Sequence, residues 1–132
     1  MLRAGWQLLF RDACRFSVPA SWRDDGSGSL VLAPDGSSLS LRSLHVSSWS
    51  AYKAQLKSAY GTPKATRDDS DHRLWLEIGE APLVQHHISV AEGLNVCSAL
   101  LTVRTRSATD SPDVIKQIAD SIGSIPEGLQ AR

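Results

Sequence analysis

The chain has 132 residues, of which 42% are hydrophobic and 21% charged, a composition typical of one globular domain and not of a disordered chain. Fourteen basic residues balance fourteen acidic ones, and this neutrality disfavours binding to nucleic acid or to an anionic membrane surface. No segment approaches the run of about 18 apolar residues that crosses a membrane, and Arg11, Asp12 and Arg15 interrupt any signal-peptide core. We therefore predict a single domain over residues 1–132, located in the cytoplasm.

The first third of the chain consists of short apolar runs separated by turn residues, a pattern typical of antiparallel strands. Pro19 ends the second run, because proline has no amide hydrogen to donate to a neighbouring strand. The strands are expected at residues 6–10, 14–18, 30–33 and 38–46, with turn-rich loops at 23–29 and 34–37.

A helix is expected over residues 47–61, where apolar side chains recur at helical spacing. Ser48 is suited to cap the start of this helix and Gly61 to cap its end. Lys53 and Lys57 lie one turn apart, and we expect them on the opposite, solvent-exposed face. The apolar stripe consists of Trp49, Tyr52, Leu56 and Ala59.

The second half of the chain predicts four more strands, and the last two flank a short Glu92-Gly93 link that is typical of a hairpin. These strands are expected at residues 64–68, 72–78, 83–91 and 94–105.

A final helix is expected after Ser111, with Pro112 at its first position and Asp113 in its first turn. Gly123 and Pro126 are expected to stop it. Its buried stripe would comprise Val114, Ile115, Ile118, Ala119 and Ile122. The segregated order of strands and helices predicts an α+β protein, an α/β/α sandwich with a central antiparallel meander sheet and two main helices.

The histidines and serines do not form a recognisable catalytic or metal-binding motif. His86 and His87 are adjacent on an expected strand, so their side chains should point to opposite faces and cannot easily bind one metal ion together. No serine lies in a G-x-S-x-G motif, and the glycine-rich segment 26–29 lacks the lysine of a phosphate-binding loop. We therefore predict no metal site, no cofactor and no enzymatic activity.

Cys14 and Cys97 are far apart in the sequence and do not form the dense cysteine pattern of a disulfide-stabilised secreted domain. We interpret them as two small buried apolar residues in a reducing compartment. A single bridge between them is the alternative.

Trp75 is the strongest candidate for a partner-binding residue. Strand alternation places it on one face with Arg73 and Glu77, away from the face of Leu74, Leu76 and Ile78. A wide aromatic side chain on a charged face is either covered by a helix or exposed as an anchor for a partner. We predict a partner-binding surface formed by Trp75, Arg73 and Glu77.

The segment FSVPASW, residues 16–22, resembles the strand-Pro-x-x-Trp entry of the PsbP-like fold superfamily. The order of the later elements is also similar, and so is the I-x-x-I-x-x-S-I pattern of the last helix at Ile115, Ile118, Ser121 and Ile122. The resemblance implies an α/β/α sandwich on an antiparallel sheet. It also implies relatives that are largely non-enzymatic: photosystem accessory subunits, Ran-binding import factors, and bacterial proteins that include type VI secretion chaperones holding apolar helices of effectors.

The chain shows no lipoprotein cysteine near its start and no transit segment, which favours a cytoplasmic bacterial member of this superfamily. We expect a non-enzymatic protein-binding module, either an adaptor, a chaperone or an immunity-type protein associated with type VI secretion. Its partner would be another protein, such as a secreted effector, and the chain itself would be a monomer or a homodimer. The alternative is a small-molecule-binding protein or enzyme in which His86 or His87 meets a carboxylate or a thiol in a concave site.

Overall fold

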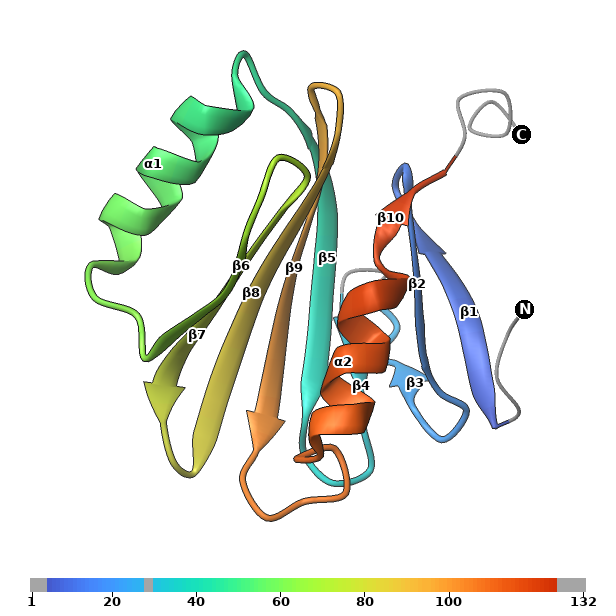
Figure 1. Ribbon diagram of the computed structural model, residues 1–132. Helices are drawn as coiled ribbons and strands as arrows, with labels where there is room; N and C mark the ends of the chain where they lie inside the picture. The colour runs from blue at the N-terminus through green and yellow to red at the C-terminus, as the bar shows by residue number, and fades with distance from the viewer. Residues whose placement is uncertain (1–4, 28–29, 126–132) are drawn as a thin grey trace.

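The computed structural model describes residues 5–27 and 30–125, which form two antiparallel sheets and two helices (Figure 1). The larger sheet has seven strands in the order β3-β4-β5-β9-β8-β7-β6, and the smaller has three in the order β1-β2-β10. The elements are β1 (Trp6–Arg11), β2 (Cys14–Pro19), β3 (Arg23–Asp24), β4 (Leu30–Leu32), β5 (Ser38–His45), α1 (Trp49–Tyr60), β6 (Ala65–Asp69), β7 (Arg73–Glu80), β8 (Leu83–Glu92), β9 (Asn95–Arg104), α2 (Pro112–Ser121) and β10 (Gly123–Ser124).

The two helices lie on opposite faces of the seven-stranded sheet, which confirms the predicted α+β class (Figure 1). We call these faces the α1 side and the α2 side. The three-stranded sheet shares the α2 side with α2, and the main core lies between these elements and the large sheet. Its fully buried members include Phe16, Val18, Leu39, Leu101 and Ile118.

The strand pairing contains two features that the sequence did not predict. The hairpin β1-β2 forms its own sheet with β10. In the large sheet, β5 pairs with β9, so the sheet consists of two meanders, β3-β4-β5 and β6-β7-β8-β9, that are joined by this pair of strands. The hairpin between β8 and β9 is as expected, but its turn is shifted by one residue. Glu92 still pairs with Asn95, and the two-residue turn is Gly93-Leu94, with the glycine at a φ of 63°.

Helix α1 begins and ends as predicted, but the side chains that it turns toward the sheet and toward solvent differ from the prediction. The Ser48 hydroxyl accepts a hydrogen bond from the Ala51 amide at 3.2 Å, and Gly61 follows the last turn with a φ of 71°. The expectation that Lys53 and Lys57 lie on the outer face is wrong, because both form ion pairs with Asp69. Of the expected apolar stripe, Trp49, Tyr52 and Leu56 are only partly buried, and Ala59 is exposed. No residue of α1 is fully buried.

Helix α2 buries Ile115, Ile118 and Ala119 as predicted. The helix ends at Ser121 with Ile122 as its C-cap, so it stops directly before Gly123 as predicted, and the chain returns to an extended conformation. Gly123 then pairs with Arg15 in the small sheet. The other expected stop signal, residue 126, lies outside the described residues.

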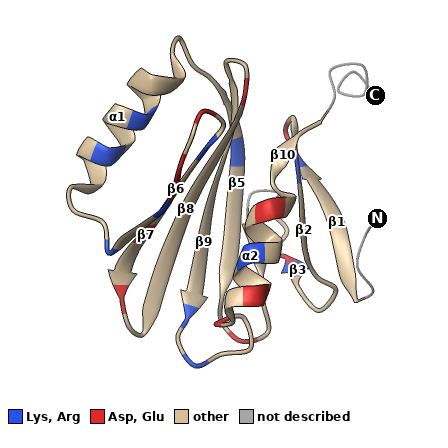
Figure 2. Ribbon diagram, viewed as in Figure 1, with Lys and Arg blue, Asp and Glu red and all other residues tan. Residues whose placement is uncertain are grey.

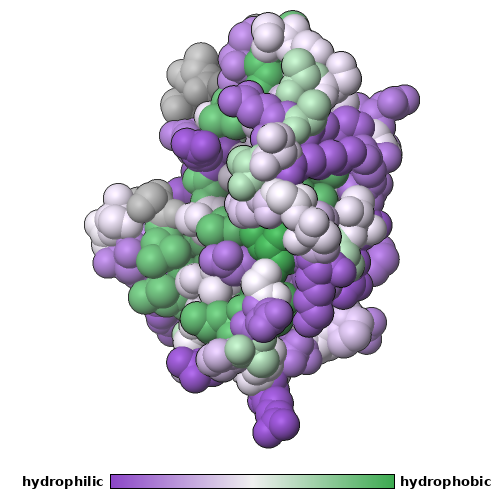
Figure 3. Space-filling model, turned by 90° about the vertical axis from the view of Figure 1, so that its left-hand side faces the viewer, coloured by the Kyte–Doolittle hydropathy of each residue, from purple (hydrophilic) through white to green (hydrophobic). Residues whose placement is uncertain are grey.

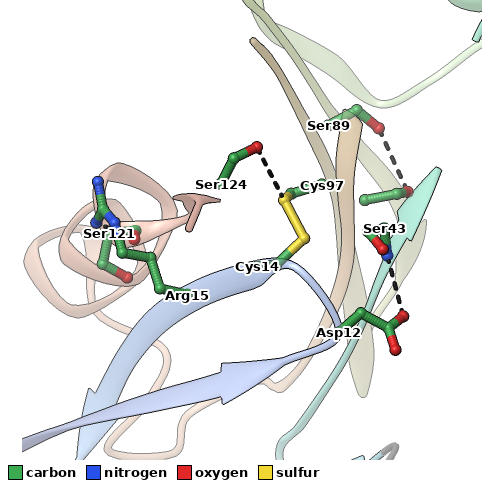
Figure 4. The surroundings of a disulfide bond; sticks show 9 residues. Asp12, Cys14, Arg15, Ser43, Ser89, Cys97, Ser121 and Ser124 are labelled. Carbon is green, nitrogen blue, oxygen red and sulfur yellow. Dashed lines mark hydrogen bonds between the residues drawn. A yellow bond between two sulfur atoms is a disulfide. The ribbon is translucent and has the colours of Figure 1, made fainter. Parts of the chain in front are cut away.

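A disulfide between Cys14 and Cys97 joins β2 of the small sheet to β9 of the large sheet (Figure 4). Our interpretation of two free thiols is therefore wrong, and the alternative of a single bridge is the one that the structure contains. Both cysteines are at most 1% exposed, and the Sγ of Cys97 lies 3.7 Å from the hydroxyl of Ser124. The bridge covalently links the two sheets, and both of its cysteines belong to the main core.

Candidate functional site

A cavity of about 520 Å³ lies on the α2 side, between α2 and the β6-β7 edge of the large sheet. We call it the α2-side cavity. It exists because α2 covers only part of this face, and long charged side chains from the sheet edge enclose the remainder. Its lining is Lys64, Arg67, Arg73, Trp75, Glu77, Val84, His86, Val103, Thr105, Asp110, Pro112, Ile115 and Lys116. The three residues predicted to bind a partner all belong to it.

Trp75 lies on the predicted face, but it is not an outward anchor. The indole is only 6% exposed, and its Nε1–H donates a hydrogen bond to Nδ1 of His86 at 3.0 Å. The guanidinium carbons of Arg67 and Arg73 lie 5.9 and 5.3 Å from the ring centroid, a cation–π arrangement. Strand alternation gave the correct face, but exposure depends on side chains from neighbouring elements that cover the ring.

Glu77 is a buried carboxylate at the floor of the cavity. Arg67 donates to its Oε1 through Nε at 2.9 Å and through Nη2 at 2.5 Å, and Lys64 lies 3.7 Å from Oε2. Burial by itself would raise the pKa of Glu77, but the bonds from Arg67 and the field of both cations outweigh it and lower the pKa below the usual 4.5. Glu77 is therefore ionised at neutral pH and holds the edge side chains in place.

Arg73 connects the sheet to α2 at one end of the cavity. Its Nε donates to Asp68 at 2.7 Å, and its Nη1 donates to Asp120 of α2 at 2.8 Å. Lys116, one turn earlier in α2, also pairs with Asp120. These contacts fix the distance between the helix and the strand edge, and so the width of the cavity.

The charges in and around the cavity balance. Four cations are matched by four carboxylates, and Figure 2 shows acidic and basic residues alternating along α2. The cations are Lys64, Arg67, Arg73 and Lys116; the carboxylates are Glu77, Asp68, Asp110 and Asp120. Val84, Val103, Pro112 and Ile115 supply an apolar lining. The cavity lining thus combines apolar side chains with charged ones whose charges balance.

His86 is buried beside Trp75 at the cavity wall. Burial lowers its pKa below 6.5, and the positive fields of Arg67 and Lys64 lower it further. The opposing field of Glu77 does not restore it, so the ring is neutral at pH 7. Since Nδ1 accepts from Trp75, Nε2 carries the proton. The described part of the chain provides no hydrogen-bond partner for this Nε2–H, which leaves one donor for a bound group.

His87 lies on the opposite face, as predicted, in a network of hydroxyl groups. Its Nδ1 is 2.6 Å from the Tyr60 hydroxyl, and its Nε2 is 2.8 Å from the Ser98 hydroxyl. Burial raises the pKa of Tyr60, so the phenol stays protonated and is the natural donor to Nδ1. The ring proton is then on Nε2, and in this tautomer His87 cannot remove the Ser98 proton as a general base would.

The structure keeps the two histidines apart from each other, in unrelated environments, and among the described residues neither imidazole forms a hydrogen bond with a carboxylate or a thiol. Residues 5–27 and 30–125 contain no group of three or more His, Cys, Asp or Glu side chains that could hold a metal ion. In the same residues no helix is long and apolar enough to span a membrane.

Sequence reasoning found three residues of this cavity, named His86 only within the alternative function, and missed Arg67. One signal was available for His86. It faces Glu77 across the β7-β8 pair, and directly opposed residues share a face of the sheet. No comparable signal placed α2, whose position follows from packing across the whole chain.

No family model matches the chain, and no curated protein matches its sequence. Among solved structures it is similar to CyanoP, the cyanobacterial PsbP of Synechocystis sp. PCC 6803, at a TM-score of 0.56 and 12% identity over 92% of this chain and 94% of that one. It is also similar to a protein of Bacteroides thetaiotaomicron at a TM-score of 0.56 and 13% identity, over 96% of this chain. The chain spans half the length of that protein. The chain has a PsbP-like fold.

Proposed function

We propose that this domain is a non-enzymatic binding module that accepts an apolar side chain of a partner protein in the α2-side cavity. The observation that carries this proposal is the combination of apolar lining residues with charged ones whose charges cancel. A neutral rim does not attract small ions, whereas burial of an apolar group gains roughly 25 cal/mol for each Å² removed from water. Tryptophan and arginine, which dominate one wall, are the residue types enriched at binding hot spots.

The rim favours a protein segment over a small molecule. Lys64 and Lys116 border the cavity with side chains that are 54% and 69% exposed, so both can reorient toward a polar main chain lying across the opening. The unpaired Nε2–H of His86 adds one donor inside the cavity. The alternative function is a small-molecule-binding protein that uses the same cavity.

A narrower form of the proposal is an adaptor, chaperone or immunity-type protein of a type VI secretion system, with a secreted effector as its partner. Its support is the resemblance in element order and the PsbP-like fold, neither of which specifies a partner. In this form the partner segment would be an apolar face of an effector helix, whose side chains would be buried in the cavity.

Two tryptophan substitutions on α2 test the proposal. Lys116→Trp places a large ring at the cavity mouth, whereas Asp113→Trp places the same ring on an exposed part of the helix that does not line the cavity. In affinity purification from the source cells, we expect Lys116→Trp to reduce recovery of the protein captured by the wild type about tenfold and Asp113→Trp to leave it unchanged. Native mass spectrometry of the same samples detects a bound small molecule, the alternative. Equal capture by both variants would rule out this cavity.

A further inference from the structure

A second cavity, of about 300 Å³, lies on the α1 side above β5 and β9. It exists because α1 leans toward the other half of the sheet, where Lys53 pairs with Asp69 of β6 and Tyr60 bonds to His87 of β8. The view that faces the left-hand side of Figure 1 shows hydrophobic patches gathered toward one side of the surface and a broad hydrophilic area toward the other (Figure 3). The residues that matter here are Ser40, Arg42, His87, Ser98 and Leu100. We call this the α1-side cavity.

Arg42 is the distinctive group of the α1-side cavity. It lies within β5, directly opposite Ser98 of β9, and it pairs with no carboxylate in the described part of the chain. The cations of the α2-side cavity, by contrast, are all matched by acidic partners. Burial, together with the field of Arg42, lowers the pKa of His87 to about 4, so His87 is neutral at pH 7 and contributes no second charge. Arg42, an exposed residue, therefore brings one uncompensated positive charge to the lining of the cavity.

The hydroxyl of Ser98 supplies a hydrogen-bond donor beside this charge. Its oxygen lies 3.4 Å from both the Ser89 and the Tyr52 hydroxyls, which also bond to each other at 2.9 Å, so it accepts a hydrogen from one of the two. Nε2 of His87, which carries the ring proton, donates to the same oxygen at 2.8 Å. The hydrogen of the Ser98 hydroxyl consequently remains available to a ligand. Ser40 places another hydroxyl at the cavity wall, two residues from Arg42 on the same face of β5.

We propose that the α1-side cavity binds a carboxylate carried on a small apolar group. A guanidinium binds a carboxylate through two parallel hydrogen bonds, and one positive charge balances one negative charge but not the two of a phosphate. Serine hydroxyls complete the coordination of the carboxylate oxygens. The half-buried Leu100 provides apolar surface for the remainder of the ligand, and the volume is at the small end of ligand pockets. This site is separate from the α2-side cavity and does not depend on its function.

The test uses benzoate as the probe and benzamide as its neutral isostere. In ¹H–¹⁵N NMR titrations at constant ionic strength, we expect benzoate to shift the amides of residues 40–42 and 98–100 saturably, with a dissociation constant of about 1 mM or below. The wild type should bind benzamide about tenfold more weakly than benzoate, and the Arg42→Gln variant should bind benzoate about tenfold more weakly than the wild type does. Arg106→Gln removes the same charge from an exposed loop residue and should leave binding unchanged. Arg42→Lys, which keeps the charge but loses the two-pronged contact, should bind with intermediate affinity.

Any of three results would overturn the proposal: no saturable shift, equal affinity for benzamide, or undiminished binding by Arg42→Gln. A final arm distinguishes the source of the carboxylate. If a short peptide with one glutamate and blocked termini displaces benzoate, the site accepts an acidic side chain of a partner. If only benzoate binds, the ligand is a free organic acid.

Discussion

At the scale of single residues, the most informative side chain is Trp75. Substitution by phenylalanine keeps an aromatic ring in the core but removes the Nε1–H that His86 accepts. We expect Trp75→Phe to lower the free energy of unfolding by about 1–2 kcal/mol, because a buried acceptor loses its donor. Trp75→Ala should cost about 3–5 kcal/mol through the void that it leaves. Denaturant unfolding measures both values, and a phenylalanine variant as stable as the wild type would contradict the assigned bond.

His87 provides a second prediction at this scale. Its pKa is lowered to about 4, so the folded state favours the neutral ring, and its contribution to stability is complete above pH 6.5 and is lost as the pH falls from 6.5 to about 4. An NMR titration of the imidazole measures the pKa directly. Arg42→Gln removes a positive field and should raise it, whereas Arg106→Gln should not. A pKa near 6.5 in the wild type would show that the ring is not buried as described.

The face on which each of these side chains lies could be predicted from the sequence, but its surroundings could not. Alternation along β7 correctly grouped Trp75 with Arg73 and Glu77, and alternation along β8 correctly separated His86 from His87. Whether Trp75 is exposed depends on Arg67 and on the placement of α2, which come from other parts of the chain. Local periodicity carries no information about such contacts.

At the scale of elements, α1 and α2 are held to the sheet in different ways. Helix α2 buries three apolar residues, whereas α1 buries none and is tied to the sheet by Tyr52, Tyr60 and lysine–aspartate pairs. We expect amide hydrogens of α1 to exchange faster than those of α2, because local opening of α1 exposes little apolar surface. Tyr60→Phe should increase exchange in α1 by about fivefold, for the loss of roughly 1 kcal/mol, and leave α2 unchanged. Equal protection of both helices would contradict this attachment.

The sequence predicted both helices within a few residues, because the capping serine, proline and glycine are local signals. It did not predict that Lys53 and Lys57 face Asp69 or that β10 follows α2. Both outcomes depend on the neighbouring strand edge, Asp69 in one case and the β2 edge in the other. A long lysine side chain can reach either toward solvent or toward an acidic residue on a neighbouring strand, and the helix sequence alone does not decide between the two.

At the scale of the whole molecule, the disulfide joins two sheets whose cysteines are 83 residues apart in sequence. Replacing both cysteines by serine should lower the free energy of unfolding by about 4 kcal/mol, since a closed loop of this length restricts the unfolded chain. Denaturant unfolding with and without reductant measures the change. An unchanged midpoint would show that the bridge contributes nothing to the stability of the domain.

The same bridge bears on where the protein resides. Disulfides persist in oxidising compartments, so this one favours such a compartment over the predicted cytoplasm. Alkylation of free thiols in the source cells before reduction distinguishes the two, and labelled cysteines would support the cytoplasm. The element order and the α+β class could be predicted from the chain, but the pairing of β5 with β9, which brings Cys97 to Cys14, could not be read from local patterns.

We propose above that the α2-side cavity receives an apolar side chain of a partner protein. Site-specific photo-crosslinking tests it most directly, with a benzophenone amino acid at position 64, on the cavity rim, or at position 57, on the α1 side. We predict a crosslink from position 64 to one partner, mapped by mass spectrometry beside an apolar residue, and none from position 57. A partner that crosslinks only from position 57 would contradict the claim.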